Sequence, residues 1–442
     1  MTQGAYASGR PVFIVDGART PFLKARGLPG PFKASDLAVS AGRALLARHA
    51  FAPDQLDEVI LGCIIPGADE ANIARIVSLR LGCGKAVPAW TVQRNCGSGM
   101  QALDCAALDI ACGRADLVLA GGTEAMSRAP LLLNDEAVLL LGRLAKAKTA
   151  MQRLKVLAGL RPRHLKPVIS LILGLTDPIV GLNMGQTAEA LAHRFKIPRE
   201  ATDAFAVESH RRLAAAQDEG RLDEITPLYE ASGKHYAQDE GVRRDTDMAG
   251  LAKLRPAFEP PHGLVTPGNS AQITDGAACL LLASEEAVKR HRLPVLARIV
   301  DTHWAGLEPG QMGLGPVHAM APILARQGLD VPDIGAWEIN EAFAVQVLAC
   351  LEAWKSDSYC REELGLSQGL PEIPRDLLNV DGGAVAIGHP VGSSGARIVL
   401  HLAHVLQRSG ARRGMASLCI GGGQGGAMLL ERVSQAQEVA HA

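Results

Sequence analysis

A cysteine that precedes a helical pattern is the first candidate for chemistry in this sequence. Cys96 lies in TVQRNCGSGMQA, where an apolar stretch passes into a glycine-serine turn and then into a helical pattern over 100–112. A helix N-terminus offers free backbone N–H groups and the positive end of the helix dipole, which lower a thiol pKa and favour the nucleophilic thiolate. Most cysteines are small core residues, so a nucleophile at this position also requires a base and an oxyanion site.

Two later motifs supply groups that a nucleophilic thiol needs. His389 lies in GGAVAIGHPVGSSGA, where Pro390 restricts it to an extended conformation before the next helix. Cys419 ends the apolar run MASLCI and opens onto GGGQGGA, whose backbone N–H groups suit a thioester oxygen. A lone histidine is more often structural, but His389 precedes its helix as Cys96 precedes its own. This shared placement predicts that the two side chains meet in one cleft.

A fourth candidate is Asn340, in WEINEAFAVQV. It follows an apparent strand over 336–339 and stands at the start of a helical stretch. Asn340 and Glu341 could merely cap that helix, because polar side chains at such a turn often bond its free N–H groups.

The elements that must position these residues form an internal repeat. Segments 97–122 and 392–423 each run from a Gly-Ser-rich start through a helix and a basic turn to an apolar strand and a glycine cluster. Elsewhere short apolar runs alternate with amphipathic stretches, as at 12–16, 36–50 and 58–63, which is typical of α/β layers. The chain is therefore predicted to contain a duplicated pair of α/β halves.

Composition excludes several other classes. The 442 residues are 48% hydrophobic, enough for two or three structural units, and 45 Lys and Arg against 46 Asp and Glu do not favour nucleic acid. Nine cysteines without a C-x-x-C pair argue against a disulfide framework or a structural zinc site. No signal peptide and no apolar run of about 18 residues is found, so the expected location is the cytoplasm.

Five blocks, in this order, make the chain resemble the thiolase family: QRNCGSGMQ, GNSAQITDGA, NEAFA, GGAVAIGHPVGSSGA and CIGGGQGGA. The resemblance implies an α/β fold, a five-layered αβαβα sandwich of two duplicated halves with an inserted loop domain. Residues 1–129, completed by about 256–290, would form the N-terminal half. Residues 130–255 would form a basic, substrate-covering insertion, and residues 291–442 the C-terminal half.

Carried over by position, the resemblance implies an acyl-transfer site. Cys96 would be the acylated nucleophile, His389 its activating base, and Cys419 the acid/base for the α-carbon of acetyl-CoA. One oxyanion hole would combine His389 with a water held by Asn340, and the other would use the N–H groups of Cys96 and Gly421. The implied reaction is ping-pong thiolysis of a 3-ketoacyl-CoA, or Claisen condensation in reverse, with CoA as a substrate and no metal or other cofactor.

The implied contacts to CoA and substrate are Asn183, Met184, Pro267, Ala271 and Phe343. Ala271 replaces a serine of the family's GNSS-type block, which removes one pantetheine contact. Asn183 stands where short-chain acetoacetyl-CoA thiolases often have histidine, which argues against strict acetoacetyl-CoA specificity.

Three alternatives stay open at this stage: an acetoacetyl-CoA-specific biosynthetic thiolase, a ketosynthase-like condensing enzyme, and a catalytically inactive thiolase-like scaffold. A second cysteine before GGG separates the chain from ketosynthases, which complete their site with other motifs. The intact set of four polar candidates argues against an inactive scaffold.

The insertion contains an unusual basic stretch. Residues 137–176 include no acid. Their cations are Arg143, Lys146, Lys148, Arg153, Lys155, Arg161, Arg163 and Lys166. The simplest interpretation is a solvated basic helix pair; the alternatives are contacts with CoA phosphates, a partner subunit or a membrane surface. The insertion resembles that of β subunits of fatty-acid oxidation complexes, which implies a hydratase/dehydrogenase α subunit as a possible partner beside a homodimer or homotetramer.

Overall fold

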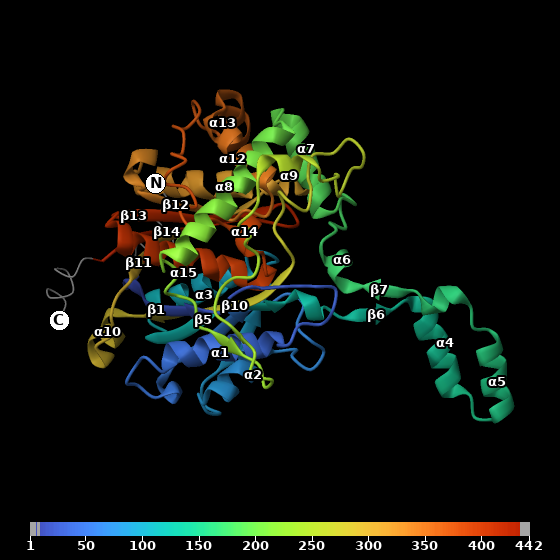
Figure 1. Ribbon diagram of the computed structural model, residues 1–442. Helices are drawn as coiled ribbons and strands as arrows, with labels where there is room; N and C mark the ends of the chain where they lie inside the picture. Colours follow the sequence, from blue (N-terminus) through green and yellow to red (C-terminus); the bar gives the residue numbers. More distant parts are fainter. Residues whose placement is uncertain (1–5, 7–8, 434–442) are drawn as a thin grey trace.

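The computed structural model describes residue 6 and residues 9–433, and one extended sheet runs through it (Figure 1). The strand order is β12-β13-β14-β11-β1-β10-β5-β3-β4, with the short β2 paired to β10. The strands of this sheet are β1 (Val12–Arg19), β2 (Leu23–Lys24), β3 (Glu58–Gly62), β4 (Ala89–Val92), β5 (Leu117–Ala125), β10 (Thr274–Ala283), β11 (Ala297–Gly306), β12 (Ala336–Ile339), β13 (Arg413–Ile420) and β14 (Gln424–Arg432).

The two ends of the sheet repeat one pattern. Strand β3 pairs in parallel with β5, and β5, β10 and β1 follow as antiparallel neighbours. Strand β12 likewise pairs in parallel with β13, followed by antiparallel β14 and β11. Among the described strands, the two half-sheets join only where β1 pairs with β11, from Val12 opposite Ile299 to Ile14 opposite Ala297. The predicted duplication is confirmed.

Helices separate and cover the half-sheets. Helices α1 and α2 pack on the first half-sheet, α11 packs on the second, and α15 contacts strands of both while lying against α3. Buried apolar side chains form one cluster under the outer helices of each half-sheet and one cluster around the central helices α3 and α15. The expected five-layered αβαβα sandwich is therefore confirmed. These helices are α1 (Ala34–Leu46), α2 (Ile73–Leu81), α3 (Ser98–Ala111), α11 (Gly315–Gln327) and α15 (Val391–Ser409).

The central layer depends on glycines where its two helices begin. A Cβ on Gly122 of β5 would lie 2.0 Å from the carbonyl oxygen of Gly392 in α15. A Cβ on Gly99 of α3 would lie 2.8 Å from the backbone nitrogen of Ala396. Only glycine allows backbones to approach this closely. The starts of α3 and α15 consequently lie against each other, as the repeat predicted.

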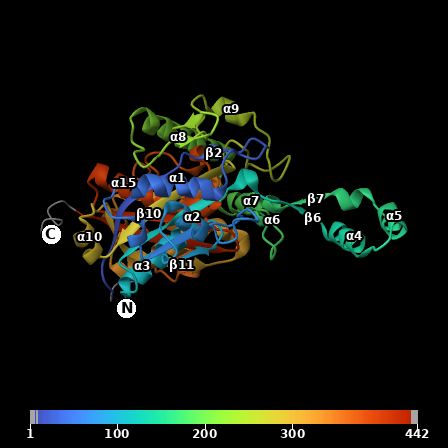
Figure 2. The same cartoon turned by 90° about the horizontal axis from the view of Figure 1, so that it is seen from below.

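The region 130–255 consists of two structurally different parts. Residues 131–174 form an arm that projects away from the sandwich in both views (Figures 1 and 2). The residues that follow return to the sandwich, where α7 and α8 pack against α12. The arm contains β6 (Leu131–Leu133), α4 (Asp135–Lys146), α5 (Ala150–Ala158), β7 (Pro167–Ile169) and α6 (Ser170–Gly174).

The remaining elements complete the covering of the sandwich. They are α7 (Met184–Phe195), α8 (Arg199–Asp218), β8 (Leu228–Tyr229), β9 (His235–Tyr236), α9 (Met248–Ala252), α10 (Glu285–His291), α12 (Ala344–Lys355), α13 (Asp357–Leu364) and α14 (Ala384–Ile387). Among the described residues, no helix has the length and apolarity needed to cross a membrane. The domain boundaries proposed above remain a prediction.

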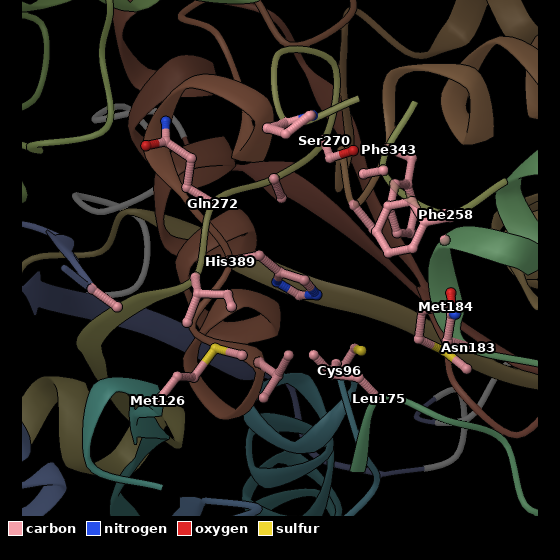
Figure 3. Close-up of a pocket in the computed structure, with 18 of the residues that line it drawn as sticks. Cys96, Met126, Leu175, Asn183, Met184, Phe258, Ser270, Gln272, Phe343 and His389 are labelled. Atoms are coloured by element: carbon pink, nitrogen blue, oxygen red, sulfur yellow. The ribbon is translucent and has the colours of Figure 1, made fainter. Parts of the chain in front are cut away.

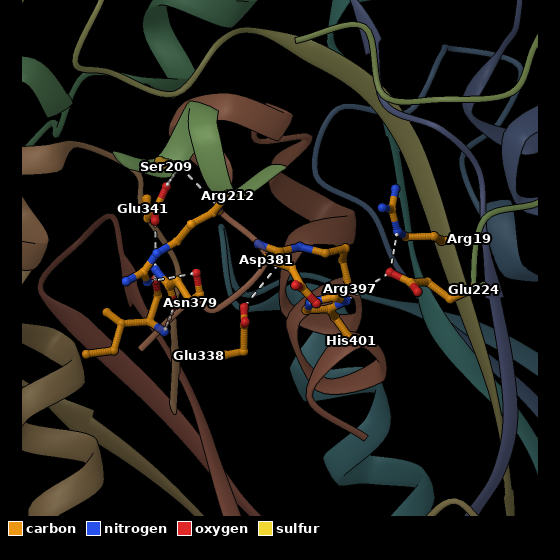
Figure 4. A network of polar contacts seen from close by, with 12 residues as sticks. Arg19, Ser209, Arg212, Glu224, Glu338, Glu341, Asn379, Asp381, Arg397 and His401 are labelled. Atoms are coloured by element: carbon orange, nitrogen blue, oxygen red, sulfur yellow. Dashed lines mark hydrogen bonds and ion pairs between the residues drawn. The ribbon is translucent and has the colours of Figure 1, made fainter. Parts of the chain in front are cut away.

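A buried network of charges ties the central helix to its surroundings (Figure 4). Arg397 of α15 lies 3.2 Å from Glu338 of β12, and both side chains are almost fully buried. One turn further along α15, His401 contacts Glu224 at 3.0 Å, which in turn lies 3.2 Å from Arg19 of β1. Because a buried charge without a partner is strongly destabilising, these pairs fix the position of α15 relative to both half-sheets.

Replacing Gly122 by alanine is expected to lower the free energy of unfolding by about 1–3 kcal/mol, since the new methyl group must displace the backbone of Gly392. Urea denaturation measures the change. Gly142→Ala in α4 is the matched control, because no atom lies within 4 Å of its added Cβ and alanine favours a helix. An unchanged denaturation midpoint for Gly122→Ala would contradict the packing argument.

Candidate active site

A cavity of about 530 Å³ lies at the starts of the two central helices (Figure 3). Cys96, which precedes α3, His389, which precedes α15, and Cys419, near the end of β13, all line it. The two halves of the fold thus each contribute a reactive side chain, as the repeat predicted. Five further residues expected at the site also line this cavity: Asn183, Met184, Pro267, Ala271 and Phe343.

Cys96 is held in a tight turn. The preceding Asn95 has a positive φ of 42°, and its side-chain amide donates a 2.8 Å hydrogen bond to the carbonyl of Gly421, beyond β13. Desolvation in the cavity raises the pKa of the Cys96 thiol, although the backbone N–H groups of Gly421 and Cys96 lower it. The expectation that the helix start makes this a low-pKa thiol was wrong, because desolvation outweighs the N–H groups. Cys96 therefore needs a base.

His389 is a neutral imidazole whose Nε2 is free to accept a proton, as a general base requires. Its Nδ1 lies 2.6 Å from the hydroxyl of Ser394, which itself donates to the carbonyl of Pro390 at 3.1 Å. Because the Ser394 hydroxyl donates its proton to that carbonyl, it can only accept a hydrogen bond from the ring. Nδ1 therefore carries the ring proton, and Nε2 keeps a lone pair. Nε2 is buried and has no hydrogen-bond partner among the described residues. Burial, assisted by the charge of Arg397, lowers the pKa of His389 to about 4, so the ring is neutral at pH 7.

Cys419 is prepared to act as a proton donor. Its side chain is almost fully buried, and burial raises the pKa of this thiol well above its ordinary value. The neighbouring sulfur of Cys96 raises the pKa further. Two thiols and a neutral imidazole therefore share the cavity, and each proton stays on its sulfur until His389 or a substrate takes it.

Asn340 and Gly421 are not among the residues that line this cavity. Asn340 follows β12, donates its backbone N–H to the carbonyl of Ser417, and is 1% exposed. Neither polar atom of its side chain has a partner among the described residues. The interpretation of Asn340 as a cap of the following helix was wrong, because α12 begins only at Ala344 with no side-chain cap. Gly421 lines a second, adjoining cavity.

That second cavity has a volume of about 260 Å³ and a largely apolar wall. Cys96 lines both cavities and therefore lies where they meet. Met126, Leu175 and Met184 also belong to both walls. Cys96 thus faces two spaces of different size.

Two supporting residues were missed by reasoning from the sequence. Ser394 fixes the tautomer of His389, and its position in the first turn of the following helix is a signal that could have revealed it. Glu124 is buried and accepts hydrogen bonds from the N–H groups of Ile64, Ile65 and Gly392 at 3.0, 3.0 and 3.2 Å. Burial raises the pKa of Glu124 to about 7 despite these bonds. Only the folded chain brings these partners together.

Comparison with known proteins agrees with this geometry. Residues 12–286 match the family model of the thiolase N-terminal domain, and residues 293–432 match that of the thiolase C-terminal domain. The chain belongs to the thiolase family. Its relatives are acyltransferases, and this thiolase is an acyltransferase enzyme as well.

Three relatives show how far the similarity extends. The human mitochondrial 3-ketoacyl-CoA thiolase is 39% identical over 96% of this chain and 98% of its own length. The 3-oxoadipyl-CoA/3-oxo-5,6-dehydrosuberyl-CoA thiolase of Escherichia coli is also 39% identical, over 96% and 100%. The crystal structure of the human mitochondrial enzyme in complex with CoA superposes with a TM-score of 0.83 at 36% identity and covers 98% of this chain and 100% of that one.

Cys96 is expected to react slowly with iodoacetamide at neutral pH, and its rate should keep rising beyond pH 9.0, the ordinary pKa of the group, because its own pKa is raised. Peptide mass spectrometry of samples alkylated across the pH range measures this rate. Cys96→Ser identifies the labelled peptide, and the exposed Cys112 reports the reactivity of the reagent. A plateau below pH 8 would show instead that Cys96 is a resident thiolate.

Proposed function

We propose that this thiolase catalyses the CoA-dependent cleavage of 3-ketoacyl-CoA to acetyl-CoA and an acyl-CoA shortened by two carbons. The observation that carries the proposal is the meeting of two protonated thiols and a neutral imidazole in one cavity. Cleavage of a carbon–carbon bond requires both a nucleophile and a proton donor for the departing carbanion, and Cys96 and Cys419 fit these roles.

In the first half-reaction, His389 Nε2 takes the proton of Cys96, and the sulfur attacks the 3-keto carbon. The bond between C2 and C3 then breaks, the acyl group stays on Cys96, and the enolate of acetyl-CoA receives a proton from Cys419. The backbone N–H groups of Cys96 and Gly421, which interact with the Cys96 thiol, would stabilise the oxyanion at C3. The unpartnered polar atoms of His389 and Asn340 suit the enolate oxygen, through a water in the case of Asn340.

In the second half-reaction, the thiol of free CoA gives its proton to the Cys419 thiolate and attacks the Cys96 thioester. Cys96 leaves as a thiolate and recovers its proton from His389. Both thiols and the imidazole return to their starting states, so the ping-pong cycle balances without a redox step. Read backwards, the same groups perform Claisen condensation.

The two cavities suit the two ends of the substrate. The larger cavity is lined by two cations, Lys24 and Arg243, and by no acid, which matches the phosphates of CoA. The smaller cavity contains no cation and is mainly apolar, which suits an acyl chain. A thiolase restricted to acetoacetyl-CoA would leave most of this smaller space unused, so we favour longer acyl groups.

The lining of the smaller cavity also bears on which of two substrate classes the chain accepts: acyl groups that end in a carboxylate or neutral acyl chains. Asp177 lines it, is almost fully buried, and uses Oδ1 to accept hydrogen bonds from the N–H groups of Ile179 and Val180. Its Oδ2 has no partner among the described residues. A terminal carboxylate, as in 3-oxoadipyl-CoA, would meet this acid without a compensating cation. We therefore propose a neutral, apolar acyl chain.

Several finer expectations remain proposals. The cytoplasmic location, the homodimeric or homotetrameric state, the hydratase/dehydrogenase partner and the absence of a cofactor other than the substrate CoA rest on the sequence alone. A role in fatty-acid degradation is supported by the 3-ketoacyl-CoA thiolases among the relatives.

Cys419→Ala is expected to accept an acyl group on Cys96 from a simple acyl-CoA, yet to lose at least about a hundredfold in cleavage of 3-ketoacyl-CoA, since general acid–base catalysis contributes about that much. Intact-mass spectrometry follows acylation, and loss of 3-ketoacyl-CoA absorbance follows cleavage. Cys96→Ser, the control, should do neither. Normal cleavage by Cys419→Ala would remove the acid role, and acylation of Cys96→Ser would remove the nucleophile.

Asp177→Asn is expected to raise kcat/KM for 3-oxoadipyl-CoA relative to 3-ketohexanoyl-CoA by about tenfold or more, because like charges about 8 Å apart repel by roughly 2 kcal/mol at an effective dielectric of about 20. Asparagine keeps the acceptor oxygen that holds Ile179 and Val180. The ratio of the two substrates cancels any general loss of activity. An unchanged ratio would show that Asp177 does not select the acyl group.

A further inference from the structure

The arm carries apolar side chains that no part of the described protein covers. Its large apolar residues, from Leu131 to Leu173, are 43 to 71% exposed at fourteen positions. Scattered exposed leucines are ordinary, but so many on one projecting segment indicate a surface that binds something. The positions are Leu131, Leu132, Leu133, Val138, Leu139, Leu141, Met151, Leu154, Leu157, Leu160, Leu165, Ile169, Ile172 and Leu173.

The arm helices are too short to be stable by themselves. Helix α4 has 12 residues and buries only Ala137, and α5 has 9 residues and buries none. Helices of this length are marginal in water and depend on burial of an apolar face. The two helices contact each other, yet their leucines stay exposed, so a further surface must supply the burial.

The charge of the arm indicates which charge the surface that covers it carries. Residues 137–176 contain eight Lys and Arg and no acid, whereas the whole chain has a net charge of −1. The rest of the chain, with 37 basic and 46 acidic residues, therefore carries −9. Lys146, Lys148 and Lys155 form no ion pair within the described part of the chain. The arm itself, residues 131–174, also contains Asp135 and Glu136, the latter 2.7 Å from Arg163, and with eight cations against these two acids it keeps an excess of six positive charges, which favours a negatively charged partner.

The distribution of the apolar groups favours a lipid surface over a protein. Successive side chains of a strand point to opposite faces, and all three residues of β6, Leu131–Leu133, are exposed. A protein partner covers one face of a strand, whereas lipid can surround both. Pairing of two arms would bring like charges together, and interfaces between proteins are poor in lysine. Lysines beside leucines suit an interfacial helix, where the charge stays at the headgroups.

We propose that the arm docks this thiolase on an anionic lipid surface, with its leucines among the acyl chains and its lysines and arginines at the phosphates. The attachment is peripheral, in keeping with the short helices.

Docking would also place the smaller cavity near the membrane. The arm ends at α6, and Leu171, Gly174 and Leu175 at its base line that cavity beside Cys96. An acyl chain leaving the lipid would then have a short path to the nucleophile. This consequence rests on the proposed function, whereas lipid binding does not.

Flotation of the full chain with vesicles tests the proposal. Vesicles of phosphatidylcholine mixed with phosphatidylglycerol should carry the protein to the top of the gradient, and vesicles of phosphatidylcholine alone should not. Raising the salt from about 0.05 to about 0.5 M should release it, because salt screens the attraction between exposed charges. Failure to bind the mixed vesicles would overturn the proposal without affecting the assignment of Cys96, which the cleavage assay tests separately.

A charge-reversal variant locates the binding surface. Lys146→Glu/Lys148→Glu/Lys155→Glu should lower the apparent affinity for the mixed vesicles at least about a hundredfold, since each cation near an anionic bilayer contributes about 1 kcal/mol. The three lysines are exposed, and their replacement removes no ion pair within the described residues. Undiminished binding by this variant would overturn the proposal.

Matched variants distinguish the effect of the arm's charges on vesicle binding from the effect of net charge and from the effect of the arm's leucines. Lys85→Glu/Arg211→Glu/Lys253→Glu changes the net charge equally on exposed positions of the sandwich and should bind vesicles nearly as well as the wild type. Leu139→Gln/Leu154→Gln should bind at least about tenfold less, because two buried leucines are lost from the lipid contact. Circular dichroism confirms that each variant is folded. Equal losses in the sandwich and arm charge variants would overturn the role of the arm.

Self-association is the competing outcome. If the arm instead binds another copy of the chain, sedimentation velocity should reveal assemblies that the Lys146→Glu/Lys148→Glu/Lys155→Glu variant loses, while vesicles fail to float the wild type. That combination would overturn docking on lipid.

Discussion

The contact between the starts of α3 and α15 is the constraint on which the rest of the structure depends. Gly99, Gly122 and Gly392 let two helices and a strand meet at distances that any side chain would prevent. Cys96 and His389 precede these helices, so the same contact brings the nucleophile and its base into one cavity. The buried pairs of Arg397 and His401 then hold α15 against both half-sheets. The central layer therefore sets the positions of the residues in the site.

The cavity keeps its reactive groups neutral. Burial raises the pKa values of both thiols and lowers that of His389, so these three groups are uncharged at rest. Charge is created only when a proton moves from Cys96 to His389, next to the N–H groups that can stabilise it. Burial of these groups makes each such interaction stronger than it would be in bulk water. The helix start at Cys96 thus orients N–H groups and does not produce a standing thiolate.

The arm and the sandwich differ in where they place their apolar and charged residues. The sandwich buries its apolar residues in clusters between layers, and the chain outside residues 137–176 contains nine more acids than cations. The arm exposes its leucines and concentrates cations among them. Because the exposed leucines of the arm are covered by no other described part of the chain, their burial requires a further surface.

The sequence by itself determined the duplication, the strand and helix patterns around Cys96, His389 and Cys419, and the basic character of the insertion. Local spacing controls these features, so they could be predicted without a structure. It could not determine the pKa of Cys96, because desolvation arises from residues distant in the chain and outweighs the local helix start. Nor could it find the contacts of Ser394 and Glu124, or that the side chain of Asn340 is buried without a partner among the described residues and caps no helix. Tertiary structure alone decided these points, since each depends on which groups are excluded from water together.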